Sequence, residues 1–253
     1  MESGTDNKRR SRFATFLLLA LLTGMSVLAL VPAMFGGAAR PVAARSADPD
    51  ALAALGACRA YADTHDFTTE TVGTIKARAF GIPYSQKVTG GRVKHGAHCV
   101  EIAESRSAIA KAALRKETDS ESFKVTRGGF DGKTAVYGDP TEMTREDYIA
   151  AYGMPNDGLV KYELDGAIIG AACVGDGVYK YTLDTTRAPR YCRGEIKTTV
   201  GCKSYPEYSS IELTLYTDGE RPVKVEICEK FRVEKFGGTS CTAEYTEVFR
   251  FEE

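Results

Sequence analysis

The spacing of hydrophobic residues changes twice along this chain. Residues 13–35 read FATFLLLALLTGMSVLALVPAMF, a run without a charged residue. In residues 50–63, apolar positions such as Leu52 and Leu55 recur at the spacing of one helix face. From Phe67 onward, apolar and polar residues alternate, which is typical of half-buried strands. The pattern therefore predicts a hydrophobic span, a short helix and a β-rich domain, in that order.

Two-residue turn signals separate most of the β-patterned runs. Asp-Gly and Gly-Gly pairs supply the positive φ angles that tight hairpins need, and sequential hairpins make an antiparallel meander. We therefore predict a mainly β (α+β) domain with roughly nine to eleven strands. Residues 159–164 and 194–200 are among the expected strands, and the glycine pairs at 90–91 and 128–129 are interpreted as a turn and a loop. The other turn pairs are those at 131–132, 157–158, 165–166, 176–177, 218–219 and 237–238.

Two or three short helices are expected beside the strands. After the helix at 50–63, the clearest signal is at 144–153, where a threonine cap, acidic residues in the first turn and a final glycine frame the run. Tyr148, Ile149 and Tyr152 would form its buried face. Residues 107–116 predict at most a helical turn or two.

The last three predicted strands place their hydrophobic residues on one side. Ile211, Leu213 and Leu215 alternate with polar residues, and Glu229 interrupts the apolar row of the following strand. One face of the sheet is therefore apolar and needs a cover. If the short helices cover it incompletely, the apolar concave face would resemble a pocket for an acyl chain. Alternatively, the sheet curls onto itself and fills that space with its own side chains.

The uncharged run at 13–35 is long enough to cross a membrane. About 20 apolar residues span the hydrocarbon core as a helix, which satisfies every backbone polar group. Basic residues crowd residues 8–12, whereas the nearest charge after the run is Arg40. Positive charge stays in the cytoplasm, so we expect a cytoplasmic tail at 1–12 and a transmembrane signal anchor that holds the chain in the lipid bilayer. A flexible linker at 36–49 would then lead to an extracytoplasmic domain at 50–253, where the polar pattern resumes.

A cleaved signal peptide is the alternative interpretation of the same run. Two small-residue patterns suitable for cleavage end at Ala33 and Ala39. A signal-peptide core is normally shorter than this run, which favours the anchor. Both interpretations export the same domain, and they differ only in whether the product is secreted or stays in the cell membrane.

The charge of the domain argues against nucleic acid as a partner. The chain has 33 basic and 34 acidic residues, and residues 1–49 hold six of the basic and three of the acidic ones. Residues 50–253 therefore carry a net charge of −4. Nucleic acids and anionic lipid headgroups both attract basic surfaces, so neither is an expected ligand of this domain.

All seven cysteines lie after the hydrophobic run, where disulfides can persist if the domain is exported. None forms a Cys-x-x-Cys pair, which leaves zinc-ribbon and thioredoxin-like sites unsupported. Cys192–Cys202 and Cys228–Cys241 are close enough in sequence to be considered first as disulfides. An odd number leaves at least one thiol unpaired. The alternative is that most of the cysteines are buried small hydrophobic residues.

Motifs for catalysis or metal binding are weak. His95, His98 and Cys99 form HGAHC, but on one strand His95 and Cys99 would be roughly 13 Å apart. His65 and Asp66 resemble two members of a catalytic triad, without a nucleophile motif to complete it. We therefore assign no catalytic, cofactor-binding or metal-binding residue, and we expect a domain that is not an enzyme.

The order of the parts also carries information. A lone N-terminal anchor and a short helix precede FTTETVGTIKARAF, YSQKV and RVKHGAHCVEIAESRS, and the chain ends with VYKYTLD, YSSIELTLYTDGERPVKVEICEKF and an aromatic last strand. Over residues 50–251 this order resembles the bacterial lipoprotein-carrier (LolA-like) superfamily. The resemblance implies a strongly curved antiparallel half-barrel with helices packed into its concave side. It carries no functional residue over to this sequence.

These observations favour a single-pass bacterial membrane protein with an extracytoplasmic binding domain. Its expected ligand is an acyl chain, a lipoprotein or another component of the cell envelope, held against the apolar face of the sheet. The alternative is a protein-interaction or sensor module of the envelope that binds a partner through an edge strand or an unpaired thiol. A small envelope enzyme is the third hypothesis.

Overall fold

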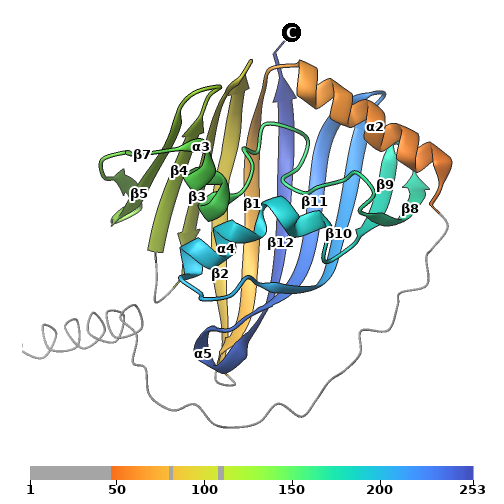
Figure 1. Ribbon diagram of the computed structural model, residues 1–253. Helices are drawn as coiled ribbons and strands as arrows, with labels where there is room; N and C mark the ends of the chain where they lie inside the picture. The colour runs from red at the N-terminus through yellow and green to blue at the C-terminus, as the bar shows by residue number, and fades with distance from the viewer. Residues whose placement is uncertain (1–46, 80–81, 108–110, 253) are drawn as a thin grey trace, which may run out of the picture. The chain divides into compact units, whose positions relative to one another are not determined.

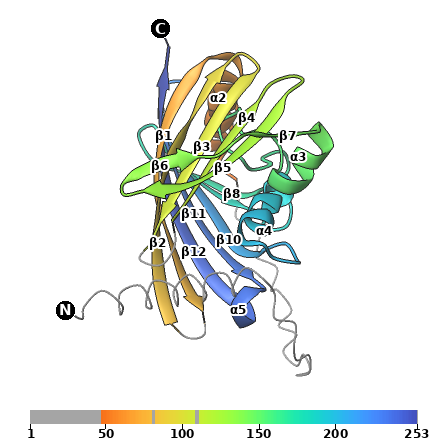
Figure 2. The ribbon, with the colours of Figure 1, turned by 90° about the vertical axis from the view of Figure 1, so that its left-hand side faces the viewer.

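Twelve strands form one open antiparallel sheet in the computed structural model, which describes residues 47–79, 82–107 and 111–252. The sheet is strongly curved, and α2, α3 and α4 all lie on its concave side (Figures 1 and 2). The mainly β fold with a meander and short helices is therefore confirmed. The predicted transmembrane run at 13–35 lies outside the described residues. Within the described ranges, no helix has the length and apolar character needed to span a membrane.

Two meanders build the sheet, and the strand order is β6-β5-β4-β3-β2-β1-β12-β11-β10-β9-β8, with β7 paired to β5. The pairing of β1 with β12 joins the two meanders and brings the start and the end of the domain together. The strands are β1 Phe67–Ala79, β2 Ile82–His95, β3 His98–Arg106, β4 Lys111–Thr118, β5 Phe123–Asp131, β6 Thr134–Tyr137, β7 Thr141–Met143, β8 Ile168–Gly175, β9 Val178–Leu183, β10 Glu207–Asp218, β11 Arg221–Val233 and β12 Thr239–Phe251.

Two of the helices begin at capping residues that the sequence contains. Helix α2 follows Asp48, whose side chain accepts a hydrogen bond from the Asp50 amide at 2.9 Å. Helix α3 follows Thr144 and ends at Gly153, which has a φ of 90°. The helices are α2 Pro49–Thr64, α3 Arg145–Tyr152, α4 Arg193–Val200, the 3-10 helix η1 Ala188–Tyr191 and the one-turn α5 Lys235–Gly238.

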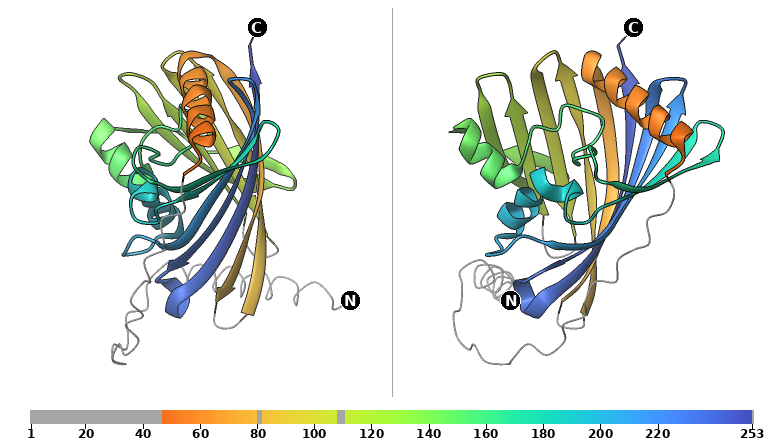
Figure 3. Two further views of the ribbon diagram at one scale, coloured as in Figure 1. Left: turned by 90° about the vertical axis from the view of Figure 1, so that its right-hand side faces the viewer. Right: turned by 45° about the vertical axis from the view of Figure 1, so that its right-hand side comes forward.

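The concave side of the sheet is filled with side chains. Helix α2 packs on β8, β9 and β11, while α3 and α4 lie together over the other half (Figure 3). The largest hydrophobic cluster includes Phe67, Tyr181, Leu213 and Phe249, all no more than 6% exposed. Two smaller clusters lie under α3 and beside α4. The structure thus shows a covered sheet face with three packed cores and not a hollow half-barrel.

Two glycine pairs that were predicted to interrupt strands lie inside strands. The glycine pair at 90–91 lies inside β2, and the pair at 128–129 lies inside β5. A Cβ added at Gly90 would lie 2.0 Å from the carbonyl oxygen of Ile102, and one added at Gly91 would lie 2.0 Å from that of Thr69. These glycines therefore allow neighbouring strands to approach closely, and the prediction of a turn there was wrong.

Three other local predictions were wrong because tertiary contacts decide the local structure. Residues 107–116 were expected to form at most a helical turn or two, but residues 111–116 belong to β4, which is paired on both sides. Residues 159–164 were expected to be a strand and have no regular structure. Residues 194–200 were also expected to be a strand and belong to α4, where Gly194 lets the helix approach the α3 backbone closely.

Candidate functional site

A single irregular segment covers the middle of the concave face. We call residues 153–167, which connect α3 to β8, the cover segment; they contain no helix or strand. Leu159, Tyr162 and Leu164 of this segment are at most 6% exposed and belong to the largest hydrophobic cluster. The cover segment therefore occupies the space above the apolar rows of the sheet, where the sequence suggested a pocket.

Arg92 of β2 holds the first half of the cover segment. Its side chain is 2% exposed, and its Nε atom is 2.7 Å from Oε1 of Glu247 on β12. The guanidinium also donates to the carbonyl oxygens of Asn156 and Gly158, at 2.8 and 2.7 Å, and to that of Leu159 at 3.3 Å. One buried cation thus satisfies three carbonyl groups of a segment that has no secondary structure to pair them.

Glu229 of β11 holds the second half of the cover segment. This carboxylate, which interrupts an apolar row in the sequence, is 0% exposed. The Tyr162 hydroxyl donates a hydrogen bond to Oε2, and the Lys161 ammonium lies 3.9 Å from Oε1. Burial alone would lower the pKa of Lys161, but the nearby Glu229 carboxylate raises it well above its usual value. The lysine therefore stays charged and pairs with Glu229.

The groups around Glu229 are held in their protonated forms. Burial, followed by the charge of Glu229, raises the pKa of the Tyr162, Tyr208 and Tyr245 hydroxyls. Burial likewise raises the pKa of the Cys192 thiol to about 12. Neither the phenols nor the thiol is activated as a nucleophile. This cluster therefore has the chemistry of an anchor for the cover segment.

A buried cation of β4 attaches α4 to the sheet. Lys116 of β4 is 4% exposed and lies 3.0 Å from Glu101 of β3 and 3.2 Å from Glu195 of α4. Burial alone would raise the pKa of Glu101, but Lys116 lowers it below its usual value. The parts that cover the concave face are thus joined to the sheet by the buried cations Arg92 and Lys116 and by the partly exposed Lys161, besides their apolar contacts.

A depression of about 240 Å³ opens between α2 and the cover segment. Its walls include Arg59 and Asp63 of α2, Tyr191, and residues 154–164 apart from Asn156. The volume is below the roughly 300–1,000 Å³ of typical ligand pockets. An extended ligand would therefore need the cover segment to move.

A second depression, of about 420 Å³, lies on the opposite, open face of the sheet. Strand alternation places Thr214, Glu226 and Thr246 there, since their neighbours Leu213 and Val225 face the core. Its lining mixes apolar groups with three carboxylates, those of Glu212, Glu226 and Glu244, which makes it poorly suited to an acyl chain.

The structure separates the cysteines that were considered first as disulfide partners. All seven cysteines are free thiols. Cys192 belongs to the largest hydrophobic cluster, whereas Cys202 belongs to the cluster beside α4. Cys228 lines the open face, whereas Cys241 packs against the concave cluster that contains Cys202. Only Cys202 and Cys241 of these four are brought into one cluster.

The residues of the HGAHC motif diverge. His95 ends β2 and His98 begins β3, so the motif is a hairpin and not one strand. His98 lies 3.4 Å from Glu117, and the buried Cys99 thiol contacts the Asn156 carbonyl at 3.6 Å. His95 joins Asp66, at 3.3 Å, on the outer edge of the domain. Asp66 is thus a partner of His95, not of a triad with His65.

Sequence reasoning found one of the residues that anchor the cover segment and missed the others. Glu229 was visible as a charge in an apolar row. Arg92 and Lys161 were not distinguishable from the many surface cations. The backbone that Arg92 binds lies 64 residues away, and Lys161 is identified only by its pairing with Glu229 of β11. A cation at an inward position of a strand was the signal available for Arg92.

Comparisons with known proteins bear only on the fold. No protein-family model and no curated protein matches the chain. Solved structures that match it include a DUF1329 family protein from Desulfovibrio piger, at 10% identity and a TM-score of 0.33, covering 80% of this chain and 93% of that one. The LolA superfamily protein NE2245 from Nitrosomonas europaea matches at 11% identity and a TM-score of 0.26, covering 80% and 94%. The ywiB protein from Bacillus subtilis matches at 9% identity and a TM-score of 0.25, covering 74% and 94%.

A LolA superfamily protein, the group that the sequence was said to resemble, is thus among these matches. TM-scores this low carry no argument about this chain.

Proposed function

We propose that this chain is a membrane-anchored, extracytoplasmic binding domain that holds an acyl chain of a lipid or lipoprotein on the concave face of its sheet. The observation that carries the proposal is the construction of the cover segment. It is irregular, it lies over the largest apolar surface of the domain, and buried charges attach it to the sheet.

The cover segment has the features of a part that moves as a unit. Its backbone hydrogen bonds to the rest of the domain are few, and those of Met154 and Glu163 go to η1 and not to the sheet. Segments without a strand or helix ladder open at lower free energy than the strands beneath them. Displacing Leu159 and Leu164 would expose apolar surface that an acyl chain could cover in their place.

The depression beside α2 supplies an entrance for such a ligand. Arg59 and Asp63 stand at its α2 wall, while Leu159 and Leu164 line its floor. A ligand with a polar head and an apolar tail would meet charged groups first and apolar groups beneath them.

Photocrosslinking tests the proposal with the full chain in a mild detergent. A palmitate analogue with a diazirine in its tail is expected to label peptides of β10, β11 and β12 that face the cover segment. Peptide mapping separates this labelling from any that occurs in residues 13–35. Labelling confined to residues 13–35, or absent from the domain, would show that the concave face does not bind the chain.

Arg92→Gln provides a matched comparison with Lys94→Gln. Arg92 binds carbonyl groups of the cover segment, whereas Lys94 binds the Ala62 and Asp63 carbonyls at the end of α2. Loosening the cover segment should raise labelling by on the order of tenfold for each 1.4 kcal/mol of lost attachment. Equal labelling of both variants would contradict a role for the cover segment as the gate.

The anchor formed by residues 13–35 is the second part of the proposal, supported by the length of the run and by the basic residues before it. Protease added outside intact cells or spheroplasts should digest residues 50–253 and leave a protected N-terminal fragment in the membrane. A soluble product that begins after Ala33 or Ala39 would instead indicate a cleaved signal peptide.

Protein interaction is a second candidate function, favoured by the charged depression of 420 Å³ on the open face. Complementary charge contributes to the specificity and rate of protein association. Replacing Glu212 and Glu244 together with glutamine should weaken a partner that uses this face and leave acyl-chain labelling unchanged.

A further inference from the structure

The register of three strands places three potential metal ligands in one row. Phe67 of β1 is paired with Lys94 of β2 on one side and with Phe251 of β12 on the other. One residue outward from each, the same register aligns Asp66, His95 and Glu252. Directly opposed residues have Cβ atoms about 4.5–5.5 Å apart, so these side chains are neighbours because of the pairing itself.

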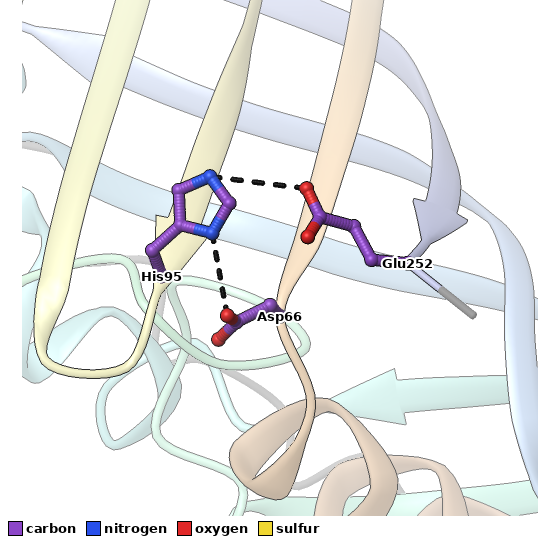
Figure 4. Close-up of side chains that lie close together, drawn as sticks. All are labelled: Asp66, His95 and Glu252. Atoms are coloured by element: carbon purple, nitrogen blue, oxygen red, sulfur yellow. Dashed lines mark hydrogen bonds and ion pairs between the residues drawn. The ribbon is translucent and has the colours of Figure 1, made fainter.

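The observed side chains converge as this register requires (Figure 4). His95 Nδ1 is 3.3 Å from Oδ2 of Asp66, and His95 Nε2 is 3.9 Å from Oε1 of Glu252. One ligand atom from each residue lies within 4.8 Å of the other two. The Gly96 amide donates to Asp66 Oδ1 at 2.7 Å, which fixes this carboxylate against the hairpin that carries His95.

These distances suit a small divalent ion. Zinc binds nitrogen and oxygen at about 2.0–2.2 Å, so two of its ligand atoms lie roughly 3.3 Å apart in a tetrahedron. His95 Nδ1 and Asp66 already have this spacing. Glu252 faces the other ring nitrogen, Nε2, so its carboxylate, which is 62% exposed, rotates towards an ion held at Nδ1. Two carboxylates and one imidazole form a donor set for zinc or a similar transition metal.

We propose that Asp66, His95 and Glu252 form a binding site for a divalent transition-metal ion of the zinc class. The ion links the α2–β1 junction, the β2–β3 hairpin and the end of β12, and water completes its coordination. Its three protein ligands come from three separate segments, so binding stabilises the closure of the sheet between β1 and β12. The proposal is independent of the acyl-chain function.

The same hairpin supplies a matched control. His98 is directly opposite His95 and lies 3.4 Å from a single carboxylate, that of Glu117. It is 41% exposed against 50% for His95, so accessibility does not distinguish the two histidines. Only the number of converging carboxylates differs.

Zinc titration of the full chain tests the proposal. The chain is purified in a mild detergent, freed of metal with a chelator and titrated calorimetrically with zinc chloride, with cobalt absorption as a second readout of coordination. Cys173 is exposed, so it is replaced by serine in every protein to remove a competing thiol. The expected result is one bound ion for each chain and a higher melting temperature with zinc than with chelator.

The variants decide between this site and any other. His95→Gln and Glu252→Gln each remove a direct ligand, so they should weaken zinc binding by at least the roughly 10–100-fold that loss of a ligand's hydrogen-bond partner costs, whereas His98→Gln should leave it unchanged. Glu252 follows the last strand, so its variant keeps the fold, and melting in chelator verifies this for each protein. The proposal is overturned if the parent binds no zinc, if His95→Gln and Glu252→Gln bind as the parent does, or if His98→Gln is as weak as they are.

Discussion

Arg92 and Lys94 lie two residues apart on β2, and each places a buried cation against backbone carbonyl groups of a different covering element. Arg92 contacts the cover segment, and Lys94 contacts the last turn of α2, at 2.7 and 2.8 Å. Both face the same side because strand residues alternate. One strand thus attaches two separate covers to the concave face, which lets each be loosened without removing the other.

Replacing Arg92 with glutamine should destabilise the domain. The change leaves Glu247, which is 10% exposed at its side chain, as a buried charge without its partner. Breaking a buried pair in this way costs about 3–5 kcal/mol. The free energy of unfolding, measured with urea, should fall by that order. Arg250→Gln is the control, because its pair with Glu70 is about two-thirds exposed and should contribute less than about 1 kcal/mol. Equal losses in both variants would contradict the role of burial.

Replacing Gly90 with alanine should also destabilise the domain, by about 2 kcal/mol or more, because the new Cβ would overlap the Ile102 carbonyl oxygen at 2.0 Å. Gly129 of β5 is the comparison, since it also lies within a strand and a Cβ added there would have no atom within 4 Å. Gly129→Ala should therefore unfold at nearly the same urea concentration as the parent. A tolerant Gly90→Ala would indicate that β2 and β3 can separate at this point.

The sequence predicted elements whose signals are local and failed where a contact across the fold decides. Helix α3 has its cap and its terminal glycine within ten residues, and it was predicted with nearly correct ends. Gly90 has the same local signature as a hairpin turn, and only the closeness of β3 explains why it lies within a strand. The pairing of β1 with β12 had no local signal at all, so neither the joining of the two meanders nor the row formed by Asp66, His95 and Glu252 could be derived.

The ion pair between Glu101 and Lys116 should make stability depend on pH. Because Lys116 lowers the pKa of Glu101, the folded state binds a proton at this carboxylate less readily than the unfolded state does. The stabilisation is present above the usual glutamate pKa of about 4.3 and is lost as the pH falls below it, towards the lower pKa of the folded state. The measurement is the free energy of unfolding between about pH 3 and 7, roughly the range in which carboxylates titrate. In Glu101→Gln this free energy should fall less as the pH is lowered. Glu117→Gln should change it less, because its pair with Arg115 is exposed.

Oxidation should form a disulfide between Cys202 and Cys241, because the fold brings these two thiols into one cluster. This pair differs from the two that proximity in sequence suggested. Both thiols lie in the cluster beside α4, where burial and then the neighbouring Cys202 raise the pKa of Cys241 to about 11. Treatment with glutathione disulfide should transfer two electrons and two protons from the two thiols to the oxidant and form one bond between them. Closing a loop of this length stabilises a protein by about 4 kcal/mol in the chain-entropy model. Peptide mapping without reductant, in a Cys173→Ser background, should identify a Cys202–Cys241 link. Links between Cys192 and Cys202, or between Cys228 and Cys241, would show instead that proximity in sequence governs pairing and that the two faces of β11 are not separated as described.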